Sequence, residues 1–239
     1  MQKPLFSTLW FGIGISLWWL LALPHEAFST AMSFESVKVA RGKKIDYGIL
    51  IPPKLDPDKM VLVLPPGAQT KPMAEMGMAA WLDHLTQQNY FVVVPLAPEG
   101  VLFFRGSEKL IPSFLKRVRK KHQLPKGRFH LVGLSNGGIS AFRVATLTPD
   151  LFRSLVALPG FAKRADLARL DSLGQMPVTI FVGAKDTKWM AKANDLVIKL
   201  RKKGSKAEVK VVGSTGHRVF QAVAGEQLTA VFRERSLSY

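Results

Sequence analysis

The segment Gly133-Leu134-Ser135-Asn136-Gly137-Gly138 lies between two runs of different pattern. Residues 128–132 have the pattern of a buried strand, and residues 139–147 that of a helix. A Gly-x-Ser-x-Gly sequence between a strand and a helix is typical of a nucleophile elbow, a sharp turn that exposes its serine at the end of a sheet. We therefore predict that Ser135 is a nucleophile, flanked by glycines because larger side chains would collide with the turn. The alternative is a glycine-rich turn whose serine is only solvated.

Strands and helices alternate from residue 60 to the end of the chain. This alternation predicts an α/β fold with a mostly parallel sheet and helices on both faces. An antiparallel hairpin over residues 34–51 precedes it, and the domain covers residues 32–239, with no insertion large enough for a lid. The other expected strands are 60–64, 90–94, 154–158, 178–182 and 207–212, and the other expected helices are 72–88, 107–122, 164–173, 189–202 and 220–233.

A serine nucleophile needs a base, and the base needs a carboxylate that orients it. His217 is the one histidine in a loop just past a strand, at the edge of the sheet where sites gather in open α/β folds. Asp186 follows the strand 178–182 in the same way. We predict a triad of Ser135, Asp186 and His217. The plainer alternatives are a helix-capping aspartate and a surface histidine.

Two backbone N–H groups should stabilise the oxyanion. Their predicted donors are Asn136, which follows the nucleophile, and Ala68, which follows the strand 60–64. Phe103, Phe104 and Trp189 come after strand ends and are candidates for an acyl pocket, although a place in the core explains them equally well. The chain has no cysteine, which excludes disulfides and thiolate catalysis, and we expect no metal site.

The chain resembles the α/β-hydrolase superfamily in three segments: 133–138, Gly-Ala-Lys-Asp at 183–186 and Gly-His at 216–217. From Gly133 through Phe152 it is similar to small, lidless esterases of the dienelactone-hydrolase, acyl-thioesterase and polyhydroxyalkanoate-depolymerase type. It departs at 65–67, Pro-Pro-Gly, where many members have His-Gly. The resemblance implies a serine hydrolase without a cofactor that cleaves small or polymeric esters, or thioesters, through an acyl-enzyme on Ser135. The alternatives are a serine peptidase of the prolyl-oligopeptidase type and a basic, non-catalytic binding domain.

The first 31 residues have the features of a secretory signal peptide. Lys3 precedes an apolar run over 9–23, and small residues at 29–31 suit a signal peptidase. Cleavage after about Ala31 would give a secreted or periplasmic protein. The alternative is an uncleaved membrane anchor, because residues 5–23 are almost long enough to span a bilayer.

The chain is strongly basic, with 34 Lys and Arg against 17 Asp and Glu and a formal charge of +17. Such a charge attracts anionic surfaces in general, so association with them is an expectation, and specific nucleic-acid binding is not. The plainer explanation is a set of solvated helix faces. Apolar residues make up 47% of the chain, which excludes a disordered protein.

Overall fold

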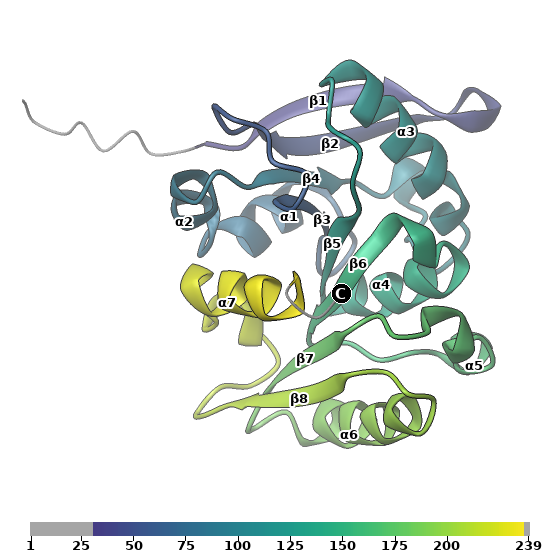
Figure 1. Ribbon diagram of the computed structural model, residues 1–239, viewed down its shortest axis with the longest axis vertical. Coiled ribbons are helices and arrows are strands. Elements are labelled where there is room, and N and C mark those ends of the chain that lie inside the picture. The colour runs from purple at the N-terminus through teal and green to yellow at the C-terminus, as the bar shows by residue number, and fades with distance from the viewer. Residues whose placement is uncertain (1–30, 237–239) are drawn as a thin grey trace, which may run out of the picture.

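One eight-stranded sheet organises residues 31–236, the part of the chain that the computed structural model describes (Figure 1). The predicted signal peptide lies outside these residues except for Ala31. The strand order is β1-β2-β4-β3-β5-β6-β7-β8. The strands are β1 Ser33–Lys38, β2 Lys44–Leu50, β3 Met60–Leu64, β4 Phe91–Pro95, β5 Phe129–Leu134, β6 Phe152–Leu158, β7 Val178–Gly183 and β8 Ala207–Val212.

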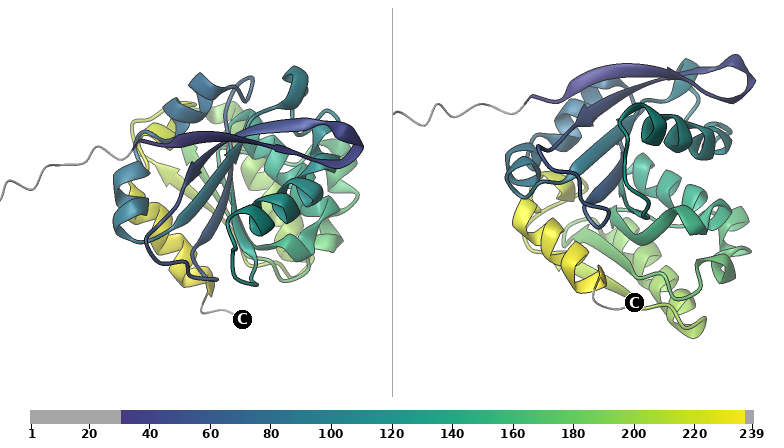
Figure 2. Two further views of the ribbon diagram at one scale, coloured as in Figure 1. Left: turned by 90° about the horizontal axis from the view of Figure 1, so that it is seen from above. Right: turned by 45° about the horizontal axis from the view of Figure 1, so that its top comes forward.

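The sheet is parallel except at its N-terminal edge. β1 pairs antiparallel with β2, and β2 pairs antiparallel with β4. Each neighbouring pair from β4 to β8 is parallel. Figure 2 shows the β1–β2 hairpin lying across one edge of the twisted sheet. This arrangement confirms the predicted fold class and the antiparallel N-terminal hairpin.

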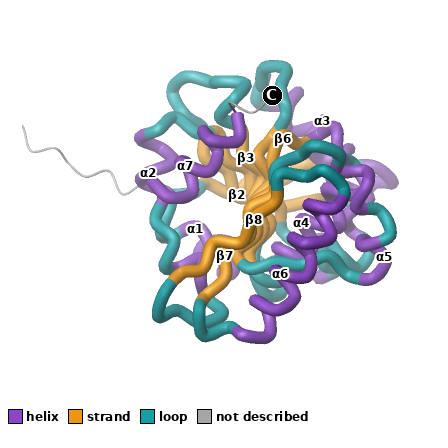
Figure 3. The backbone as a smooth tube through the Cα atoms, turned by 60° about the horizontal axis from the view of Figure 1, so that its bottom comes forward, coloured by secondary structure: helices purple, strands orange, loops and turns teal. Residues whose placement is uncertain are grey.

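Helices cover both faces of the sheet (Figure 3). α1, α2 and α7 lie on one face, and α3, α4, α5 and α6 lie on the other. No large lid lies between the strands of the described part, and no helix there is long and apolar enough to cross a membrane. The helices are α1 Lys71–Met78, α2 Leu82–Gln87, α3 Ile111–Lys121, α4 Asn136–Leu147, α5 Arg164–Leu167, α6 Thr187–Lys202 and α7 Gly225–Ser236.

The single helix predicted over 72–88 is wrong, because the chain breaks there into α1 and α2. Trp81 lies at the break, fully buried, and its indole N–H donates to the carbonyl oxygen of Val223 at 2.7 Å. A buried indole needs such an acceptor, which a regular helix would not have brought within reach. The last helix also begins later than expected, at Gly225, where a Cβ would lie 2.6 Å from the Cβ of His84 in α2.

β5 lies at the centre of the parallel part and is buried along its whole length. Its last residues pair with β3 on one side and β6 on the other, with Gly133 opposite Leu64 and Leu134 opposite Leu158. The residue that follows β5 therefore emerges at the carboxyl edge of the sheet, between two further strand ends. That residue is Ser135.

Candidate active site

Ser135 occupies a backbone conformation that side chains rarely adopt, with φ 55° and ψ −113°. Such a conformation costs roughly 1–3 kcal/mol and persists only where the surroundings enforce it. Here its N–H donates to the carbonyl oxygen of Leu158 at 3.2 Å. A Cβ on Gly137 would lie 1.9 Å from the carbonyl oxygen of Leu64, and one on Gly133 would lie 2.3 Å from that of Gly137. Glycines at both positions are therefore required for the turn to form.

Three side chains meet at this edge of the sheet. The Oγ of Ser135 lies 2.7 Å from Nε2 of His217, and Nδ1 of His217 lies 2.7 Å from Oδ2 of Asp186. An ionised carboxylate can only accept, so Nδ1 carries the proton and Nε2 is left to accept from the serine hydroxyl. The side chain of Asp186 is 11% exposed and that of His217 is 41% exposed. The imidazole is thus held by the carboxylate at Nδ1, while part of the ring stays open to solvent.

The loops after β7 and β8 hold this geometry by binding each other. Lys185 N–H donates to the carbonyl oxygen of Thr215 at 2.9 Å, and Ala184 N–H donates to that of Val212 at 3.0 Å. A Cβ on Gly183 would lie 2.3 Å from the carbonyl oxygen of Gly216, so the loops touch closely. These contacts fix the spacing between the Asp and the His that they carry.

The two predicted oxyanion donors belong to segments that are tied together. Asn136 is the first residue of α4, and the N–H groups of a first helical turn have no acceptor within the helix. Its side-chain amide donates to the carbonyl oxygen of Gly67 at 3.0 Å, next to the exposed Ala68. Gly67 has φ 58°, in the left-handed region that glycine tolerates. The structure brings Ala68 and the elbow together, and the donor role of each N–H group stays a prediction.

The sequence matches no protein-family model, and no curated protein matches it. Solved structures do match its backbone. A thermostable esterase is 18% identical, with a TM-score of 0.63 over 84% of this chain and 62% of that esterase. The dienelactone hydrolase from Anabaena variabilis ATCC 29413 is 18% identical, with a TM-score of 0.64 over 87% of this chain and 95% of its own. An S-formylglutathione hydrolase from Agrobacterium tumefaciens is 15% identical, with a TM-score of 0.65 over 85% and 95%.

The chain has the α/β-hydrolase fold. The match covers nearly the whole described part, although this chain spans less than two thirds of the length of the thermostable esterase. Identities this low establish the fold and leave the reaction to be argued from the site. In this α/β-hydrolase fold, the order Ser135, Asp186, His217 along the chain is the order expected for its catalytic residues.

Gln69 anchors the loop that carries Ala68, and the sequence analysis missed it. Its side chain is fully buried, donates to the Oγ of Ser140 at 3.0 Å and accepts from the N–H of Phe103 at 2.9 Å. Its carbonyl oxygen accepts from the N–H of Ala97 at 2.9 Å. A lone glutamine in a loop carries no pattern, so only its burial reveals the role.

The three predicted pocket residues have different positions. Phe103 is fully buried in the core, so its assignment to the substrate pocket is wrong. Phe104 is only 6% exposed, and the Nζ of Lys163 lies 4.2 Å from its ring centroid. Trp189 is half-buried beside the triad, with its ring centroid 4.7 Å from that of His217. Of the three, Trp189 is the one that contacts a triad residue.

Proposed function

We propose that this protein is a serine esterase that hydrolyses carboxylic esters or thioesters through an acyl-enzyme on Ser135. The observation that carries the proposal is the pair of 2.7 Å contacts that join Ser135, His217 and Asp186 at the strained turn. The names of the structural neighbours, which include an esterase and two hydrolases, agree with it.

The geometry supports a two-step reaction. Oγ of Ser135 attacks the acyl carbon while its proton passes to Nε2 of His217, and Asp186 stabilises the resulting imidazolium. The new oxyanion accepts hydrogen bonds from the N–H groups of Asn136 and Ala68. The bond to the leaving alcohol or thiol then breaks, and His217 returns the proton to that leaving group. Water, activated by His217, releases the acid by the reverse sequence and restores the free serine.

A fluorophosphonate probe tests the nucleophile directly. We expect it to label the wild-type protein on the peptide that contains Ser135, as read by mass spectrometry, and to leave the folded Ser135→Ala variant unlabelled. Hydrolysis of p-nitrophenyl acetate should be lost in the same variant. Equal labelling of both proteins would exclude Ser135 as the nucleophile. Faster turnover of a peptide p-nitroanilide than of any ester would favour a peptidase. No turnover of either substrate class would favour a binding domain.

We also propose export of the chain, with residues 1–31 as a cleaved signal. The proposal rests on the apolar run 9–23 and the small residues at 29–31. N-terminal sequencing of protein recovered from the periplasm or medium should begin near Met32. An intact N-terminus on membrane-bound protein would indicate an anchor.

A further inference from the structure

A cavity of about 580 Å³ lies between the segment that follows β6, including α5, and the middle of α6, with Arg143 of α4 also in its lining. This volume lies within the roughly 300–1,000 Å³ that small-molecule sites occupy. Its aromatic wall is Phe161, which follows the end of β6. Its charged lining residues are Arg143, Lys163, Arg164, Lys192 and Asp195.

Two aromatic rings connect this cavity to the reacting centre. The ring centroid of Phe161 lies 4.9 Å from that of Trp189, in an edge-to-face contact. The same Trp189 ring lies 4.7 Å from the imidazole of His217. A substrate whose ester group lies at Ser135 would reach the cavity by extending past Trp189.

The charges inside the cavity do not cancel. Arg143 is neutralised by an ion pair with Asp166, and its second contact is with Glu108 at 3.5 Å. Asp195 is paired with Lys199 on the next turn of α6. Lys163, Arg164 and Lys192, in contrast, form no ion pair within residues 31–236. The cavity therefore keeps an excess of three positive charges.

Two of these charges lie over aromatic rings. Nζ of Lys192 lies 4.3 Å from the ring centroid of Phe161, and Nζ of Lys163 lies 4.2 Å from that of Phe104. A ring face attracts an ammonium group but satisfies none of its hydrogen-bond donors fully. Lys192 thus lies beside the aromatic wall and Lys163 over the neighbouring Phe104 ring, each with donors free for an anionic acceptor.

We propose that this cavity binds an anionic group of the substrate, so that the enzyme prefers esters whose acyl or alcohol part carries a carboxylate or a phosphate. The inference rests on the proposed function, because it concerns the same reacting centre. A neutral group in the cavity would displace water from unpaired cations without replacing its hydrogen bonds, whereas an anion would form charge-assisted ones. Because the site is open, salt should weaken the preference.

Matched ester pairs test this preference. The first pair places the charge on the alcohol side, as para-acetoxybenzoate and its uncharged amide. The second places it on the acyl side, as the mono-p-nitrophenyl ester of adipic acid and its uncharged amide. We expect kcat/KM to favour the anion by about tenfold in at least one pair at low ionic strength. Inorganic phosphate and adipate, used as competitive inhibitors, show which anion fits better.

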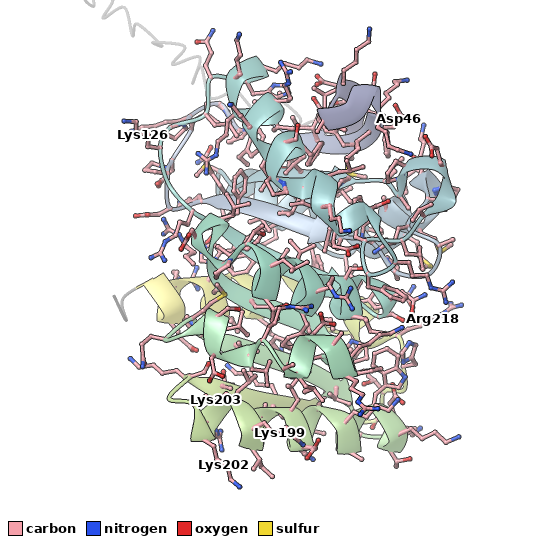
Figure 4. All side chains as sticks on the ribbon, turned by 90° about the vertical axis from the view of Figure 1, so that its right-hand side faces the viewer. Asp46, Lys126, Lys199, Lys202, Lys203 and Arg218 are labelled. Carbon is pink, nitrogen blue, oxygen red and sulfur yellow. The ribbon has the colours of Figure 1, made fainter. Side chains whose placement is uncertain are left out.

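Three charge-reversal variants show which lysines produce the preference for the anionic ester. Lys163→Glu and Lys192→Glu should each remove the anion-to-amide ratio of kcat/KM or invert it. Lys202→Glu makes the same change of charge at the other end of α6, ten residues or about 15 Å from Lys192. Figure 4 shows Lys202 on the opposite side of the molecule from Arg218, which follows the triad histidine. This control should keep the wild-type ratio.

A binding experiment separates this inference from the proposed function. We expect para-hydroxybenzoate, but not its amide, to quench tryptophan fluorescence in Ser135→Ala, and Lys163→Glu to abolish that response. Triad-dependent hydrolysis with an anion-to-amide ratio of kcat/KM near one in both pairs would contradict the anion site and still support the proposed esterase activity. A ratio lowered equally by Lys202→Glu would contradict the anion site too. Carboxylate binding without any ester hydrolysis would instead keep the site and contradict the proposed function.

Discussion

Two serine–histidine pairs lie at opposite ends of β5, and they have the same length. At the end of the strand, Oγ of Ser135 is 2.7 Å from Nε2 of His217. At its beginning, Nδ1 of His130 is 2.7 Å from Oγ of Ser154 in β6. A search for serine and histidine within hydrogen-bond distance would return both. Only the first pair has the surroundings that nucleophilic catalysis needs.

The surroundings of the two imidazoles differ in partner and in exposure. The second nitrogen of His217 contacts the carboxylate of Asp186, whereas that of His130 faces the backbone oxygen of Asp58 at 3.3 Å. His130 is fully buried and stacks on Phe232 at 4.4 Å. Burial lowers its pKa from the ordinary 6.5 to about 3, so His130 stays neutral and cannot take up a proton near neutral pH. The difference shows that an orienting carboxylate and an open face, not the distance, define the candidate site.

Replacing the serine of each pair should separate them most strongly. We expect Ser135→Ala to lower kcat on p-nitrophenyl acetate by about four to six orders of magnitude, because no nucleophile remains. Ser154→Ala should leave kcat within about twofold of wild type and lower the free energy of unfolding by about 1–3 kcal/mol, because His130 loses a buried partner. Steady-state kinetics and urea unfolding measure both quantities. A large loss of kcat in folded Ser154→Ala would show that the comparison is wrong.

The aspartates behind the two imidazoles give the second largest contrast. Asp186→Asn should lower kcat by about four orders of magnitude, because an amide can hold the imidazole in the wrong tautomer. Asp58→Asn should leave kcat unchanged, because the backbone of Asp58 faces His130 and its exposed side chain pairs with Arg153 at 2.6 Å. Rates measured at equal folded fractions decide the matter. Equal kcat for Asp186→Asn and wild type would contradict the role of Asp186.

The contrast between the two pairs also explains what could be predicted from the sequence. Strand ends of a parallel sheet gather at one edge, so the Gly-x-Ser-x-Gly motif and the order of elements together predicted that Ser135, Asp186 and His217 lie there. No comparable rule predicts which side chains of a loop are buried. Phe103 has the same sequence setting as a pocket residue, yet it lies in the core, and Gln69 carries the loop through buried hydrogen bonds that have no sequence signature.

Tertiary contacts also decide the finer features. The break between α1 and α2 depends on Trp81 reaching Val223, a residue far along the chain. The cavity depends on Phe161 and Lys163, which follow β6, lying beside Lys192 in α6. Periodicity reports neighbours within one element, so it predicts neither feature.

The elbow itself can be tested through its glycines, which have no counterpart at Ser154. Gly137→Ala should lower the free energy of unfolding by about 3 kcal/mol or more, since its Cβ would overlap the carbonyl oxygen of Leu64 and force backbone to move. Gly213→Ala is the matched control, because a Cβ there meets nothing within 4 Å. Urea unfolding measures both. Equal free energies of unfolding for the two variants would show that a Cβ at residue 137 does not collide with the carbonyl oxygen of Leu64.

The smallest expected effect concerns how stability depends on pH through His130. The unfolded chain binds a proton at this residue below its ordinary pKa of 6.5, whereas the folded chain does so only near a pKa of about 3. The contribution of His130 to the free energy of unfolding is therefore complete above pH 6.5 and is lost as pH falls toward about 3. Between about pH 7 and about pH 5 this loss amounts to about 2 kcal/mol. His130→Gln should be less stable throughout, but its free energy of unfolding should fall less over that range. Parallel curves for the two proteins would show that His130 is not buried as a neutral group.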